Sequence, residues 1–144
     1  MKRQKNEDDL RHSLKRFVKT QANNVLHVSW VESHATAIGI PDVSYCCRGT
    51  EGWIEMKAGP GLEVRAAQVL WMEARILAGG HPLILIEWGG DVFLCHGVWS
   101  GCLRAEPSKE NIERLSSRRW ADGINEQEFL TVLQCPESIY DITQ

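Results

Sequence analysis

The chain has 144 residues, of which 43% are apolar and 24% charged, and its formal net charge is −3. This composition is that of an ordinary globular protein and excludes a low-complexity or fibrous chain. Apolar runs stay well short of the ~20 residues that span a bilayer, and the basic start MKRQKNEDDL has no apolar stretch after it. We therefore expect a single cytoplasmic domain over residues 1–144, with no membrane partner and with five free cysteines.

A helix and three strands are predicted first. Apolar residues at helical spacing, with acids in the first turn, predict an amphipathic helix over residues 7–20. Runs rich in β-branched and aromatic residues predict the strands that follow, at 25–31, 42–47 and 53–57. The turn sequence RGTEG joins the second and third of these strands, so we expect them to pair as a hairpin.

A second helix, a hairpin and a helical tail complete the predicted order. The helix is expected over 62–78, ending at Gly79-Gly80, with an apolar stripe of Val64, Ala67, Leu70, Trp71, Ala74 and Leu77. Strands are predicted at 83–88 and 92–95, and helices around 108–119 and 125–133. The order αβββαβ with a helical tail predicts an α/β (α+β) fold, in which a mixed sheet is flanked by helices. The core then covers about 7–97 and the tail about 98–144.

An acidic and basic cluster follows from the predicted strands. Asp42 begins one strand directly after Pro41, and Glu55 and Lys57 lie two positions apart on the next strand. Side chains alternate along a strand, so Glu55 and Lys57 share one face while Met56 points into the core. If the two strands pair across the turn, Asp42 lies beside the end of the sheet that carries Glu55 and Lys57.

This cluster suits phosphodiester hydrolysis. Two neighbouring carboxylates repel each other unless a divalent cation lies between them. Mg²⁺ takes oxygen ligands and keeps several waters, so Asp42, Glu55 and the backbone carbonyl of Met56 suffice to hold it. Lys57 can orient or help deprotonate an attacking water and stabilise charge that grows on phosphorus. The sequence therefore predicts a metal-dependent hydrolase.

PD followed by ExK, on adjacent strands between two helices, resembles the PD-(D/E)xK nuclease superfamily. The form GIPD…WIEMK, with a glutamine in the next helix, is similar to its VRR-NUC-type and phage junction-resolving branches. The resemblance covers about residues 7–95 and implies a restriction-endonuclease-like core and a Mg²⁺- or Mn²⁺-dependent DNA endonuclease. It implies Asp42 and Glu55 as metal ligands and Lys57 as the catalytic base or water-positioning group. Gln68 corresponds to the glutamine that supports the active site in this superfamily.

Members of the superfamily carry one further acid upstream. Glu32 is our candidate, as a catalytic residue and metal ligand, because it ends the preceding strand; the acids of the first helix, Glu7, Asp8 and Asp9, are the alternatives. Arg65 can clamp a phosphate, and His34 can approach DNA from its loop, although an exposed loop histidine is the simpler interpretation. Residues 1–20 hold seven Lys or Arg against three Asp or Glu, and Lys15, Arg16 and Lys19 can lie along phosphates.

The leading hypothesis is an endonuclease that recognises the shape of branched DNA and works as a homodimer, because resolving a junction needs paired incisions. A site-specific homing or restriction-type endonuclease of a phage or mobile element is one alternative, in which the helical tail reads bases in duplex DNA. A non-catalytic DNA-binding module is another. We interpret Arg75 as a surface charge, and His96 has no evident partner. Candidates for a dimer face or a base-stacking platform are Trp99 and Trp120, whereas burial is expected for Trp30, Trp53, Trp71 and Trp88.

Overall fold

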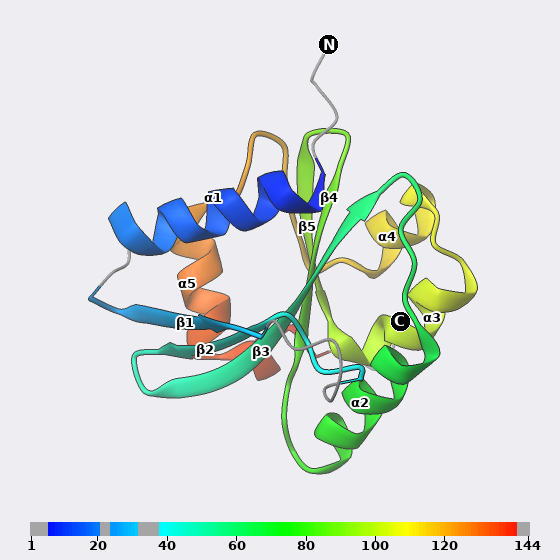
Figure 1. The fold of residues 1–144 in the computed structure, drawn as a ribbon, viewed down its shortest axis with the longest axis horizontal. Helices are drawn as coiled ribbons and strands as arrows, with labels where there is room; N and C mark the ends of the chain where they lie inside the picture. Colours follow the sequence, from blue (N-terminus) through cyan, green and yellow to red (C-terminus); the bar gives the residue numbers. More distant parts are fainter. Residues whose placement is uncertain (1–5, 21–23, 32–37, 141–144) are drawn as a thin grey trace.

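The computed structural model describes residues 6–20, 24–31 and 38–140 of the chain. A six-stranded sheet runs through the middle, with helices on both of its faces (Figure 1). The elements are α1 (Glu7–Thr20), β1 (Leu26–Trp30), β2 (Val43–Cys47), β3 (Thr50–Gly59), α2 (Ala66–Leu77), β4 (Leu83–Trp88), β5 (Asp91–His96), η1 (Gly97–Trp99), α3 (Ser100–Ala105), α4 (Lys109–Leu115), β6 (Arg118–Trp120), α5 (Glu126–Gln134) and η2 (Pro136–Ile139). The predicted class, an α+β fold with a mixed sheet and αβββαβ order, is confirmed. In the described ranges, no helix combines the length and the apolar character that crossing a membrane requires.

Neighbouring strands in the sheet are also neighbours in the chain, in the order β1-β2-β3-β4-β5-β6. Every pair is antiparallel except β3 and β4, which are parallel and are joined across the sheet by α2. The predicted hairpin of β2 and β3 forms, but its turn is shorter than RGTEG. Cys47 pairs with Thr50, and Arg48 and Gly49 make the turn with φ of 47° and 90°.

The sheet separates two apolar clusters. Ile54 and Met56 of β3 are fully buried on the face covered by α1 and α5, as expected for Met56 (Figure 1). Ile84 and Ile86 of β4 are buried on the opposite face, against the cluster that includes Met72 of α2. The apolar run of β4 is therefore explained by burial on both faces. Glu55 and Lys57, alternating with Ile54 and Met56, project on the α2 side.

The apolar stripe predicted for α2 is confirmed only in part: Val64 is buried before the helix and Trp71 packs against the cluster that includes Met72. The helix begins at Ala66 rather than at residue 62, and two members of the stripe, Leu70 and Leu77, are 65% and 89% exposed. The buried side chains of α2 are instead Gln68 and Met72. Hydrophobicity alone selected the wrong side of the helix, because the side turned to the sheet carries a glutamine that has polar partners there.

The tail also differs from its prediction. The helix expected over 108–119 ends at Leu115, and Arg118–Trp120 add β6 to the edge of β5. The short helix α3 was not predicted. Strand β6 forms by pairing with β5, Val92 with Trp120, Phe93 with Arg119 and Leu94 with Arg118, and no local pattern in SSRRW indicates this pairing.

The burial of the tryptophans differs from the prediction. Trp120 is 6% exposed and packs edge-on against Phe129, so it provides neither a dimer face nor a stacking platform. Trp99 is half-buried against the α2-side cluster. The tryptophans for which burial was predicted are all only partly buried: Trp30, Trp53, Trp71 and Trp88.

Candidate active site

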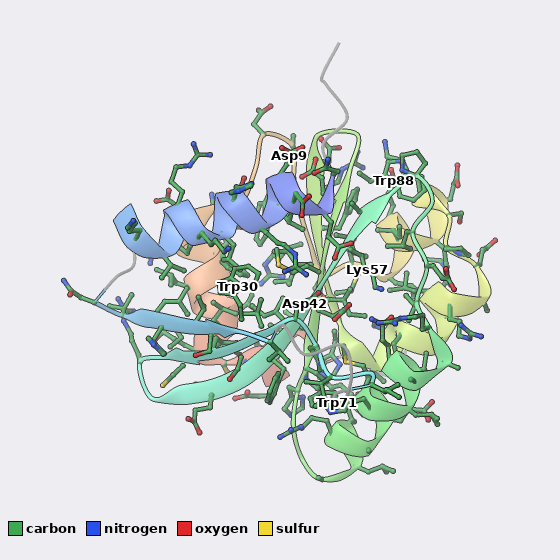
Figure 2. The ribbon with its side chains drawn as sticks, in the orientation of Figure 1. Asp9, Trp30, Asp42, Lys57, Trp71 and Trp88 are labelled. Carbon is green, nitrogen blue, oxygen red and sulfur yellow. The ribbon has the colours of Figure 1, made fainter. Side chains whose placement is uncertain are left out.

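The register of β2 and β3 brings Asp42 to Glu55. Val43 pairs with Ile54, so the residues that precede and follow them, Asp42 and Glu55, are neighbours. The Asp42 N–H donates to Glu55 Oε1 at 3.2 Å, and the Met56 N–H donates to Asp42 Oδ2 at 2.9 Å. Asp42 and Lys57 lie between α1 and α2 in the view of Figure 2.

Gln68 connects α2 to this strand. Its Nε2 donates to Glu55 Oε2 at 2.8 Å, while its Oε1 accepts from Lys57 Nζ and from the Arg65 N–H, both at 2.9 Å. Lys57 Nζ also lies 3.5 Å from Glu55 Oε2. The carboxylate on one side and the two donors on the other fix the orientation of the Gln68 amide. Asp42, Glu55, Lys57 and Gln68 thus form one connected network.

Arg11 of α1 was missed in the sequence and contacts the network directly. Its Nη2 donates to Asp42 Oδ1 at 3.0 Å and lies 3.7 Å from Glu7 Oε1. Glu7 and Arg11 are four residues apart on the polar face of α1, a spacing that marks an ion pair but does not show where the pair points. The contact with Asp42 is decided by the packing of α1 over the sheet.

Glu7 is the first-helix acid that reaches the network. Burial and the nearby Asp42 raise the pKa of Glu7, and Lys57 and Arg11 oppose that shift. Asp9 instead exchanges hydrogen bonds with Asn6 at the start of α1, and Asp8 is exposed. Two sequence candidates, Glu32 and His34, lie outside the described residues.

The charge of the network is unbalanced at Glu55. The side chain is 4% exposed, and its burial together with the neighbouring Asp42 raises the pKa of Glu55 to about 8, with Lys57 acting against the shift. Once Glu55 is ionised, three acids, Glu7, Asp42 and Glu55, face two cations, Arg11 and Lys57. A buried carboxylate in this position gains from an additional positive charge.

The donor set fits a divalent cation of the Mg²⁺ kind. Asp42 and Glu55 supply carboxylate oxygens, and the Met56 carbonyl lies on the same side of β3 as its N–H, which faces Asp42. These are the hard oxygen ligands that Mg²⁺ prefers. In this arrangement, the described residues include no group of three or more His, Cys, Asp or Glu side chains placed to hold a metal. Two carboxylates and a carbonyl leave the remaining positions to water.

The predicted DNA-contacting residues are spread around the network. Arg65 is exposed directly before α2, beside Gln68. On α1, Lys15 lies over the Trp30 ring at 4.9 Å, near Arg11, whose guanidinium is 5.4 Å from the same ring. Arg16 instead lines a cavity of about 280 Å³ with Glu87 and Asp122, and Lys19 is exposed near the end of α1.

His96 has a partner that the sequence did not indicate. It is fully buried, and its Nδ1 accepts from the Val98 N–H at 2.9 Å, which leaves the proton on Nε2, 2.9 Å from His81 Nδ1. Burial and His81 lower the pKa of His96 to about 4. The buried His96 and the partly buried His81 support the loop before β4, and within the described part of the chain neither contacts the Asp42 network.

The arrangement as a whole can bind a divalent cation at Asp42 and Glu55 and hold an ammonium beside it. Gln68 bonds both Glu55 and Lys57 and so fixes their relative position. Arg11 donates to Asp42 Oδ1 and offsets its charge. Such a site can bind a phosphate and direct a water at it. No protein-family model and no curated protein matches the chain.

Proposed function

We propose that the chain is a divalent-metal-dependent DNA endonuclease of the PD-(D/E)xK type. The observation that carries the proposal is the convergence of Asp42, Glu55, Lys57 and Gln68 through hydrogen bonds of 2.8 to 3.2 Å. A structural ion-pair network also uses such residues, but it has no need of two neighbouring carboxylates, one of them buried, that repel each other when both are ionised. That repulsion suits a site that binds a cation.

Each residue has a distinct task in this proposal. Asp42 and Glu55, with the Met56 carbonyl, hold Mg²⁺ or Mn²⁺, which when bound neutralises the phosphate and lowers the pKa of a bound water. Lys57 Nζ positions the attacking water and places positive charge beside the phosphoryl oxygens. Gln68 holds Lys57 Nζ and Glu55 Oε2 in register, since its amide bonds both. Glu7 is the proposed upstream acid, through its closeness to Asp42.

Branched DNA is the substrate class that we propose first, with a homodimer making the paired cuts. The tail is used to build the fold, since Phe129, Val132 and Leu133 of α5 are fully buried. The outward residues of α5 include Glu126 and Glu128, which repel phosphates. A tail of this kind is poorly suited to reading base sequence, which favours recognition of shape over a homing or restriction-type specificity.

The test is cleavage of supercoiled plasmid and of a four-way junction, each with Mg²⁺, Mn²⁺ or EDTA. We expect cutting with the metals and a preference for the junction over a linear duplex. Glu55→Gln and Lys57→Ala should each lose at least about a hundredfold in rate, since each removes a group that acts on the reacting phosphate. The matched controls Glu110→Gln and Lys109→Ala alter the same residue types at the start of α4, away from the network, and should cut normally.

Two results would count against the proposal. Absence of cutting of both substrates with either metal would remove the nuclease assignment and leave the DNA-binding module. Cutting that survives in Glu55→Gln would show that the chemistry lies elsewhere. A single-chain mass in gel filtration, with and without junction, would contradict the homodimer.

A further inference from the structure

The face of β3 that carries Glu55 and Lys57 continues into a second group of side chains. Alternate strand residues share a face, so Lys57, Glu55, Trp53 and Glu51 form one row. Successive members of such a row are about 7 Å apart. Trp53 is therefore the next side chain after Glu55 along the strand, at the scale of one nucleotide from the candidate active site.

Trp71 and Arg75 of α2 complete this group. Trp71, labelled in Figure 2, lies one turn after Gln68 and meets Trp53 edge-on with ring centroids 5.5 Å apart. The Arg75 guanidinium lies 4.6 Å from the Trp71 ring and 5.6 Å from the Trp53 ring. Its aliphatic stem packs closely on Gly80, where an added Cβ would come within 2.7 Å of Arg75 Cδ. Arg75 is exposed, as predicted for a surface charge, and its stem and guanidinium are held by these contacts.

The Arg75 guanidinium keeps its hydrogen-bonding capacity. Within the described ranges it contacts the two indole rings and pairs with no carboxylate or carbonyl. A guanidinium offers five N–H donors in a planar fork that matches a phosphate. An arginine that is stacked on aromatic rings and has uncommitted donors is prepared for an anionic ligand.

A pocket adjoins this group. Its volume is about 310 Å³, and Trp53 and Arg75 line it together with Ser44, Glu51 and His81. Trp53 provides an aromatic wall, while the hydroxyl, carboxylate and imidazole offer donors and acceptors at the rim. An aromatic wall with a few polar groups and an adjacent cation is the chemistry that recognises a nucleotide.

We propose that this pocket, the Trp53–Arg75 pocket, holds one unpaired nucleotide of the substrate beside the phosphate that is cut. The base lies against Trp53, and Arg75 binds the phosphate of that nucleotide. A base within a duplex is stacked and paired and is not available to the pocket, whereas an unpaired base at a flap, a bulge or an open branch point is. The proposal rests on the proposed nuclease function and names what that site selects: DNA with an unpaired nucleotide next to the cut.

The test measures binding and leaves cleavage out. Full-length Lys57→Ala protein in EDTA is titrated into a flapped duplex with the fluorescent base 2-aminopurine at the first unpaired position, and into the fully paired duplex. We expect the flapped DNA to bind more tightly and its fluorescence to be quenched. Adding Trp53→Leu or Arg75→Ala should weaken binding about tenfold and abolish the preference for the flap, whereas Trp53→Phe should retain both.

Two further variants make the test specific. Gly80 lines the pocket without a side chain, so Gly80→Ala retains the Trp53 and Arg75 side chains but displaces the Arg75 stem, and should reduce the flap preference in part. Trp99→Leu removes an equally half-buried tryptophan outside the pocket and should leave binding as in the parent. Because Arg75 is exposed, Arg75→Ala should fold normally even if Trp53→Leu does not.

The proposal is overturned if folded Arg75→Ala and Gly80→Ala bind the flapped DNA as the parent does and quench it equally. It is also overturned if the parent shows no preference for the flap. Neither result bears on the nuclease assignment, which is tested by cleavage with the wild-type protein. Flap preference without metal-dependent cutting would instead retain the pocket and remove the nuclease.

Discussion

The Gln68 amide donates a 2.8 Å hydrogen bond to Glu55 Oε2, which joins the first turn of α2 to the middle of β3. Gln68 is 3% exposed, so this bond and the one accepted from Lys57 Nζ are shielded from water. Hydrogen bonds to charged groups in such places are stronger than those between neutral groups.

Gln68→Ala should lower both stability and activity. It leaves Glu55 Oε2 without its amide donor and frees Lys57, which we expect to cost about 2 kcal/mol in the free energy of unfolding. The cleavage rate should fall about 10- to 100-fold, as for other groups that orient catalytic residues. Urea denaturation and plasmid cutting check the two effects. Gln127→Ala, on the exposed face of α5, is the control, and equal behaviour of the two variants would contradict the role of Gln68.

Glu55→Gln should stabilise the metal-free protein at alkaline pH. The pKa of Glu55 is raised from 4.5 to about 8, so between these values the folded state retains a proton that the unfolded state releases. Stability from this group is therefore complete below pH 4.5 and is lost as the pH rises to 8, by up to about 1.4 kcal/mol per pH unit. Thermal melts in EDTA should show a higher Tm for Glu55→Gln than for wild type at pH 8, and little difference at pH 4.5.

The same two proteins, wild type and Glu55→Gln, should respond differently to Mg²⁺ in thermal melts. At pH 8 it should raise the Tm of the wild type, since a cation between Asp42 and Glu55 relieves their repulsion. It should not raise the Tm of Glu55→Gln. A wild-type Tm that Mg²⁺ and Mn²⁺ leave unchanged at millimolar concentration would speak against a metal site at these residues.

Arg11→Ala should tighten metal binding. The guanidinium bonds Asp42 Oδ1 and lies near Glu7, so it supplies positive charge to the same carboxylates that a cation would use. Removing it should lower the Mg²⁺ concentration for half-maximal Tm increase several-fold, and lower the Tm without metal. Arg11→Lys keeps the positive charge, so its half-maximal Mg²⁺ concentration should lie between those of the wild type and of Arg11→Ala. An unchanged half-maximal concentration would mean that Arg11 does not compete with the metal.

Gly39→Ala should disturb the loop that delivers Asp42. Gly39 has a φ of +82°, and an added Cβ would lie 2.3 Å from the backbone oxygen of Ala67 in α2. Gly61, with a φ of +89° and no atom within 4 Å of such a Cβ, is the matched control for backbone strain alone. We expect Gly61→Ala to lower the free energy of unfolding by about 1 kcal/mol, and Gly39→Ala to lower it by at least about twice as much. Equal losses in urea denaturation would show that the loop does not depend on this close approach.

Much of the candidate site could be predicted because its parts are close in the chain and follow strand alternation. Glu55 and Lys57 share a face by the two-residue period, and a tight hairpin brings Asp42 to them. Gln68 was predicted through the resemblance to the superfamily, which implies a supporting glutamine in the next helix. Arg11 could not be placed, because its contact with Asp42 spans 31 residues and depends on where α1 crosses the sheet.

The sequence by itself determined the order of elements as far as β5, the α+β class and the Asp42–Glu55–Lys57 cluster, since these depend on local periodicity and one short turn. Tertiary structure decided which side of α2 faces the sheet, that Arg118–Trp120 become β6, and that Trp53, Trp71 and Arg75 gather beside the site. The reason is physical: a helix or an edge strand is oriented by the total burial and hydrogen bonding of distant partners. Gln68 is buried and Leu77 is exposed, which is the reverse of what hydrophobicity alone predicts.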